Sequence, residues 1–72
     1  MNGYQALANG IIEQAVKDYR DALRRLKKHP DDNTVMKEAM ELEEFFHSTW
    51  YGVLTQVDPD YLIDRLRKET VK

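Results

Sequence analysis

The sequence predicts an all-α fold, a small three-helix bundle with a long central second helix that forms one domain over residues 1–72. Apolar residues recur at about the 3.6-residue helical period in three segments, and proline–aspartate turns separate the segments. Pro30 ends the first segment because the residue before a proline is pushed out of the helical region. Asp58 and Pro59 have the cap-then-proline form of a helix start. The expected helices cover about 4–28, 33–55 and 59–69.

The first predicted helix begins with a capping-box pattern, in which Asn2 caps the helix and Gln5 reaches back to it. Gly10 inside the pattern costs about 1 kcal/mol relative to alanine, so a start at Asn9 is the alternative. The expected buried stripe has alternating spacings of four and three residues: Ile12, Val16, Tyr19, Leu23 and Leu26.

The second predicted helix has the widest apolar surface in the chain. Such an arc is too wide for one neighbouring helix to cover, so we expect this helix to be central or to contribute to a dimer. Phe46 and Trp50 lie one turn apart on its longest stripe, and we expect both to anchor the core. That stripe comprises Val35, Ala39, Leu42, Phe46, Trp50 and Val53.

Composition excludes several classes of protein. The chain has 72 residues, no cysteine, 42% apolar and 33% charged residues, and a net charge of −2. The absence of cysteine excludes disulfides, thiolate zinc sites and a cysteine nucleophile, and it fits a reducing, cytoplasmic compartment. No apolar run approaches the roughly 20 residues that span a bilayer, so we expect no membrane partner. The chain as a whole is not a polycation for nucleic acid.

The distribution of charge predicts a protein-binding surface on the second helix. Residues 31–56 hold six acidic and one basic side chain, whereas residues 1–30 hold three acidic and six basic ones. An acidic row of this kind suits a basic groove on a partner protein, although a solvated helix face is the commoner outcome. Phe45 and Tyr51 fall outside the main apolar stripe, and partly exposed aromatics beside charges are typical interface anchors. The protein-binding candidates are Asp31, Asp32, Glu38, Glu41, Glu44, Phe45 and Tyr51.

The first helix carries a basic ridge, which predicts nucleic-acid binding as the alternative function. Regularly spaced cations can follow a phosphate backbone. However, Glu13 and Asp21 border the ridge, and no recognition-helix pattern accompanies it. The ridge consists of Lys17, Arg20, Arg24, Lys27 and Lys28.

No residue pattern predicts catalysis. Glu44 and His47 have the Glu-x-x-His spacing of di-iron helix bundles, but those sites need a second such motif and two further glutamates. Glu43 and His47 are one turn apart, and we expect them to form a hydrogen-bonded pair at the core boundary. Because no phosphate-binding loop or nucleophile elbow is present either, we expect no enzyme activity, no cofactor and no metal site.

Three stretches, residues 12–20, 45–51 and 60–63, resemble small uncharacterised helical proteins of phages and integrative elements of Gram-positive bacteria. The resemblance implies an accessory protein that acts in the cytoplasm of a bacterial host by binding a host protein. The specific function it suggests is anti-CRISPR-like inhibition of a host defence nuclease. A self-associating structural protein, such as a homodimer, is a further alternative.

Overall fold

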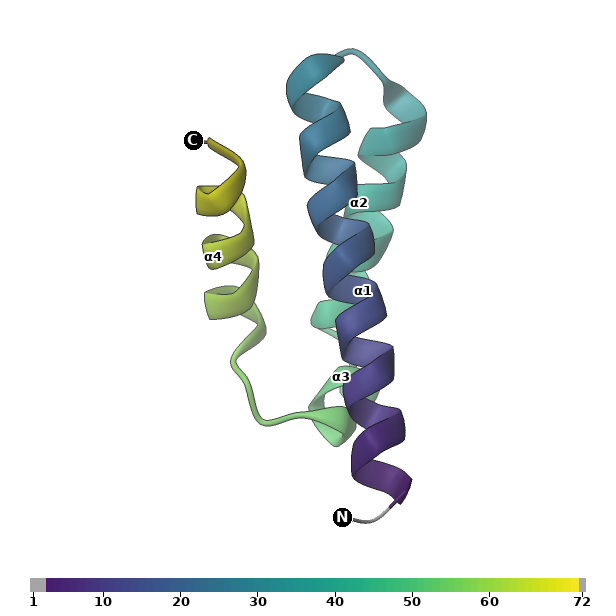
Figure 1. Cartoon of the computed structure of the whole chain (residues 1–72). Helices are drawn as coiled ribbons and strands as arrows, with labels where there is room; N and C mark the ends of the chain where they lie inside the picture. The colour runs from purple at the N-terminus through teal and green to yellow at the C-terminus, as the bar shows by residue number, and fades with distance from the viewer. Residues whose placement is uncertain (1–2, 72) are drawn as a thin grey trace.

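The computed structural model describes the backbone of residues 3–71 and the side chains of residues 9–70. These residues form helices and no strand, which confirms the all-α prediction. The predicted cap at Asn2 lies outside the described residues. The helices are α1 (Gly3–Lys28), α2 (Asn33–Phe46), α3 (Thr49–Leu54) and α4 (Pro59–Val71) (Figure 1).

Helices α1 and α2 form an antiparallel hairpin (Figure 1). The turn between them is made as predicted, because Pro30 cannot continue α1 and Asp32 caps α2. The Asp32 carboxylate accepts hydrogen bonds from the backbone amides of Thr34 and Val35, at 3.0 and 3.2 Å. These bonds satisfy amides that have no partner within the helix itself.

The predicted long second helix is wrong, since the chain breaks it after Phe46 and starts α3 at Thr49. Ser48 makes the break. Its backbone is extended, and its hydroxyl donates to the Phe45 carbonyl oxygen at 2.6 Å. The Ser48 hydroxyl oxygen in turn accepts a hydrogen bond from the Tyr51 amide at 3.2 Å. A serine that caps a new helix in this way competes with continuation of the old one.

The break changes which aromatic residue enters the core. Tyr51 is 2% exposed, whereas Trp50 is 55% exposed and Val53 is 72% exposed. The expectation that Trp50 anchors the core is therefore wrong, because Trp50 lies on the stripe of Phe46 only if the helix continues unbroken. Tyr51, predicted as an exposed anchor, is instead a core residue.

The central element is α1, not the second helix. It contacts α2, α3 and α4, and α4 runs beside it in the same direction (Figure 1). The carboxylate of Glu69 in α4 pairs with Arg20 at 3.2 Å, and the Lys27 ammonium donates to the Thr70 carbonyl oxygen at 3.0 Å. The apolar residues that predicted a central second helix are divided between α2 and α3. Neither of these two helices therefore needs to be surrounded by other helices.

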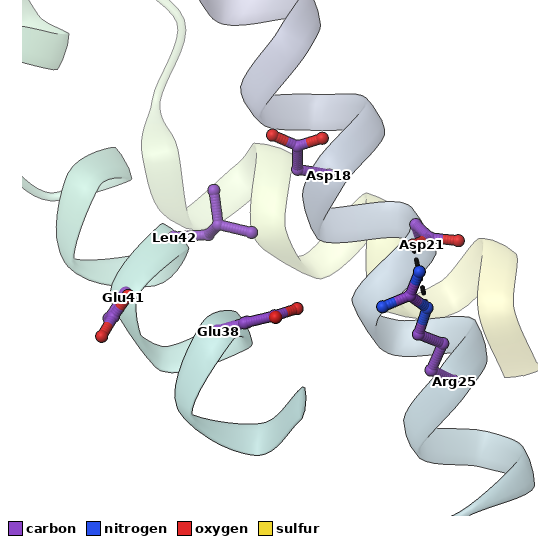
Figure 2. Close-up of a pocket in the computed structure, with 6 residues that line it drawn as sticks. All are labelled: Asp18, Asp21, Arg25, Glu38, Glu41 and Leu42. Atoms are coloured by element: carbon purple, nitrogen blue, oxygen red, sulfur yellow. Dashed lines mark ion pairs between the residues drawn. The ribbon is translucent and has the colours of Figure 1, made fainter. Parts of the chain in front are cut away.

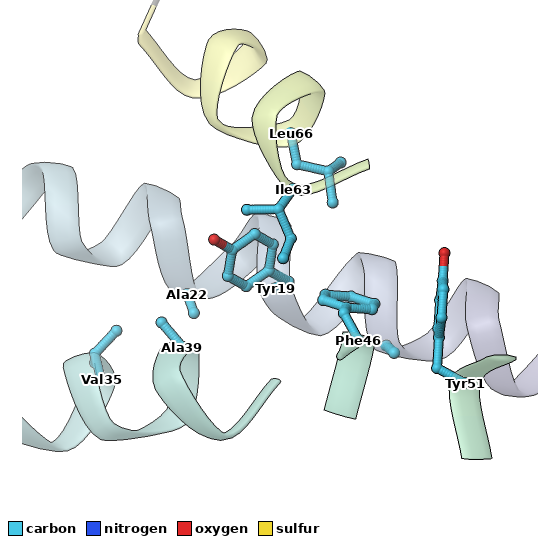
Figure 3. Packing of buried hydrophobic residues seen from close by; sticks show 9 residues of the cluster. Tyr19, Ala22, Val35, Ala39, Phe46, Tyr51, Ile63 and Leu66 are labelled. Carbon is cyan, nitrogen blue, oxygen red and sulfur yellow. The ribbon is translucent and has the colours of Figure 1, made fainter. Parts of the chain in front are cut away.

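The core is a cluster of aromatic rings enclosed by small and branched side chains (Figure 3). Phe46, which is fully buried, meets Tyr19 and Tyr51 edge-to-face, with ring centroids 5.6 and 5.8 Å apart. Ile63 and Leu66 of α4 belong to the same cluster. The prediction that Phe46 anchors the core is confirmed.

A polar tie at the core boundary joins three helices. The Tyr19 hydroxyl of α1 donates to a Glu43 carboxylate oxygen of α2 at 2.8 Å. Arg67 of α4 donates to the same oxygen at 2.9 Å and to the Tyr19 hydroxyl oxygen at 3.3 Å. Burial and the neighbouring Glu43 carboxylate raise the pKa of Tyr19, so its hydroxyl keeps the proton that it donates.

His47 is hydrogen-bonded to the backbone of Glu43 and not to its side chain, which differs from the predicted pair. Its ring Nδ1 lies 2.9 Å from the Glu43 backbone carbonyl oxygen, and its Nε2 lies 2.7 Å from a carboxylate oxygen of Asp60. The ring thus links the end of α2 to the first turn of α4. The hydrogen bond to Asp60 raises the pKa of His47, and the one to the Glu43 carbonyl adds to this effect.

Candidate protein-binding groove

A groove follows the side of the α1–α2 hairpin that α4 leaves open. Asp18 and Arg20 of α1 are two positions apart, so at about 100° per residue they point to nearly opposite sides of the helix. Arg20 faces α4, where it pairs with Glu69. Asp18 lines the groove on the other side, together with residues of α2.

One end of the groove is apolar. It has a volume of about 360 Å³, and its floor is made by Ala15 of α1 and by Leu42 and Phe45 of α2, with Ile11 at the edge. Leu42 and Phe45 are half-buried because they pack against the core on one side and face the groove with the other. Their apolar surface is thus available to a partner without any change of fold.

The other end of the groove is acidic, with a volume of about 450 Å³ (Figure 2). Figure 2 shows Glu38 of α2 extending toward the Asp21–Arg25 pair of α1, while Glu41 lies farther out on α2. Arg25 is engaged by Asp21 at 3.1 Å. The lining of this end comprises Asp18, Asp21, Arg25, Glu38, Glu41 and Leu42.

The groove contains some of the predicted protein-binding candidates and excludes others. Glu38, Glu41 and Phe45 line it. Glu44 is exposed but lies outside both parts of the lining, because it points away from α1. Asp31 is exposed in the turn between α1 and α2, and Asp32 is occupied in capping α2.

The predicted basic ridge is divided by α4. Arg20 and Lys27 contact the C-terminal part of α4 through Glu69 and the Thr70 carbonyl oxygen. Lys17, Arg24 and Lys28 are exposed on α1. A phosphate backbone that followed the ridge would therefore compete with α4 for two of its five cations.

The α1 wall of the groove was missed in the sequence, although the sequence contains its signal. The spacings along this wall are three, four, three and four residues. The wall therefore has the same helical period as the buried stripe of this helix, on the neighbouring face. Asp21 was considered only as a border of the basic ridge, and Asp18 only as one of the three acidic residues in the first thirty. The residues at these positions are Ile11, Gln14, Asp18, Asp21 and Arg25.

The acidic end of the groove has carboxylates on both of its walls. Among the residues that the structure describes, no three histidine, aspartate or glutamate side chains lie close enough together to hold a metal ion. The carboxylates are instead spaced along α1 and α2. Within residues 3–71, no helix combines the length and the hydropathy that crossing a bilayer requires.

Comparison of the chain with protein-family models, with curated proteins and with solved structures finds no match.

Proposed function

We propose that this protein acts by binding another protein, and that the α1–α2 groove holds the partner. The observation that carries the proposal is the charge of the groove, where four carboxylates face solvent beside a single guanidinium that Asp21 already engages. Charge of one sign in a concave surface attracts partners of the opposite sign and speeds their association. The adjoining apolar end supplies surface that a partner can bury.

The partner that we propose is a host protein with a basic surface, and a defence nuclease is the specific candidate. Two considerations support it. The resemblance to phage and mobile-element proteins implies an accessory factor directed at a host component. Nucleases carry cationic surfaces for the phosphate backbone, and a row of carboxylates can occupy such a surface in place of phosphates.

A pull-down from the bacterial host tests the proposal. The bait is the wild-type chain, compared with a groove variant in which Glu38→Lys and Glu41→Lys are combined. The matched control is Glu44→Lys with Glu13→Lys, which makes the same change of net charge outside the groove. We expect a partner that the wild type and the control retain and the groove variant loses. Exposed reversals change stability by only about 0.5 kcal/mol each, so the folds should be equal in circular dichroism.

Two results would contradict the proposal. One is retention of every partner by the groove variant. The other is salt-sensitive binding of DNA or RNA that disappears in a variant with Lys17→Glu and Arg24→Glu, because that result would favour the basic ridge.

Self-association is a second candidate function, and the exposed face of α3 favours it. Trp50, Val53 and Val57 are exposed large apolar residues close together in sequence, around a short helix. Sedimentation of the wild type and of Trp50→Ser over a range of concentrations tests it. A concentration-dependent dimer that Trp50→Ser abolishes would support this candidate, and a monomer at all concentrations would exclude it.

A further inference from the structure

We infer that the groove is a site for a basic amphipathic helix. This inference rests on the proposed function of the groove as a protein-binding site. The apolar and acidic ends share Asp18 and Leu42 in their linings, so they form one continuous surface. Its two walls are helices that lie antiparallel (Figure 1), and the apolar and acidic hollows follow one another along the seam between them. An added helix fills such a seam by packing its ridges into the groove between the walls.

On the opposite side of the hairpin, the packing of α4 is an example of how a helix binds there. There α4 lies along α1, places Ile63 and Leu66 in the core, and uses Arg67 to reach Glu43 of α2. The helix α4 therefore combines an apolar face with a cation that pairs with an α2 carboxylate. A partner helix in the open seam meets the same kinds of surface, and it would complete a four-helix arrangement around α1 and α2.

The order of residues along the groove fixes the pattern of the partner. From Ile11 to Arg25 the α1 wall measures about 21 Å, at about 1.5 Å per residue, which matches a helix of about 14 residues. The half of that helix over Ile11 and Phe45 should present leucine-like side chains. The half over Asp21 and Glu38 should present lysine or arginine on the same face. A second copy of this chain is disfavoured in register, because two acidic grooves repel each other.

Synthetic peptides test the inference directly. The probe is a peptide of about 14–18 residues with leucines on one face of its first half and lysines on the same face of its second half. A second peptide of equal composition has these residues scrambled around the helix, and a third has the original order but two central prolines. Binding is measured by chemical-shift changes in the ¹⁵N-labelled protein and by fluorescence anisotropy. We expect shifts along the α1–α2 groove and the tightest binding for the ordered helical peptide.

Matched variants locate the binding. Asp18→Asn with Glu38→Gln should weaken it about threefold to tenfold, since each partly exposed ion pair contributes modestly. The control Glu13→Gln with Glu44→Gln removes the same charge outside the groove and should stay within about twofold. At the apolar end Ile11→Ser should weaken binding about fivefold. Val53→Ser, a similar change on the exposed face of α3, should have no effect.

The outcomes separate this inference from the proposed function. Equal binding of all three peptides in the groove would refute the inference that the partner is a helix. The proposal that the partner is basic would still stand. If no peptide binds but the pull-down recovers a groove-dependent partner, the helix is again wrong and the protein-binding function stands. Absence of both would refute the inference and the proposed function together. Shifts confined to α3 or α4 would refute the groove as the site.

Discussion

Separate replacement of Phe46 and Trp50 by alanine tests the core that the helix break produces. Phe46 is fully buried and contacts three aromatic rings, and loss of such a side chain costs about 3–5 kcal/mol. A domain of this size has a net stability of about 3–5 kcal/mol, so Phe46→Ala should be largely unfolded. Phe46→Leu keeps most of the volume and should remain folded with a loss of about 1–2 kcal/mol.

Trp50→Ala should be much milder. Because Trp50 is 55% exposed, folding removes about 100 Å² of its surface from water, equivalent to at most about 2.5 kcal/mol. Alanine's better helix propensity offsets roughly 0.5 kcal/mol of this loss. We therefore expect a net cost of about 1–2 kcal/mol and a folded, cooperatively unfolding variant.

Urea denaturation followed by far-ultraviolet circular dichroism measures all three variants. Trp50 is the single tryptophan of the chain, so its fluorescence gives an independent measurement on the wild type. A half-exposed indole should emit at long wavelength and be quenched by acrylamide in the native state. An unfolded Trp50→Ala variant beside a stable Phe46→Ala variant would refute this description of the core. So would native Trp50 emission that remains shielded at high dilution.

Three further predictions concern other parts of the fold. Tyr19→Phe removes the 2.8 Å hydrogen bond to Glu43 and should lower the stability by about 1–2 kcal/mol, seen as a fall in Tm of about 5–10 °C; an unchanged Tm would contradict the three-helix tie. Gly10→Ala should raise the stability by up to about 1 kcal/mol, because a Cβ there meets no atom within 4 Å and alanine favours the helix; a fall in Tm would count against a helical Gly10. The pKa of His47 is raised by Asp60, so its stabilisation is complete below its ordinary pKa of 6.5 and is lost as the pH rises through the raised value. Thermal melts across this pH range should show a decline in the wild type that His47→Gln lacks, and equal profiles would exclude the link to α4.

Local signals made much of the fold predictable. The turn after α1 and the start of α4 depend on side chains within a few residues, such as Asp32 on the amides of α2 and Asp58, which accepts from the Asp60 amide at 2.9 Å. Such bonds form wherever the sequence supplies them. The start of α2 at Asn33 and the start of α4 at Pro59 could therefore be predicted from the sequence.

The break at Ser48 was not predictable in this way. No proline or glycine marks positions 47 and 48, and the apolar stripe continues through them to Trp50. Whether Trp50 or Tyr51 enters the core depends on the fit against Tyr19 and Phe46, which is a property of the assembled helices. The position of α4 depends in the same way on distant partners.

The groove was half predictable. Glu38 and Glu41 were candidates because α2 is visibly acidic, and Phe45 was a candidate because it falls outside the main apolar stripe. Asp18 and Asp21 were missed because the surrounding helix is basic on average, and only its position beside α2 separates the acidic side from the basic one. Charge summed along a helix conceals what its individual faces present.

The three-helix tie has a consequence for the order in which the chain assembles and opens. Arg67 is 48 positions from Tyr19 but 24 from Glu43, and each halving of a loop lowers its closure cost by about 0.6 kcal/mol. Docking of α4 is thus easier once the α1–α2 hairpin exists, and local contacts such as those of the hairpin form early. In the native protein, α4 should then be the first unit to open, with amide exchange faster than that of α1 and α2. Because both walls of the groove belong to the hairpin, we expect the proposed binding surface to persist when α4 detaches.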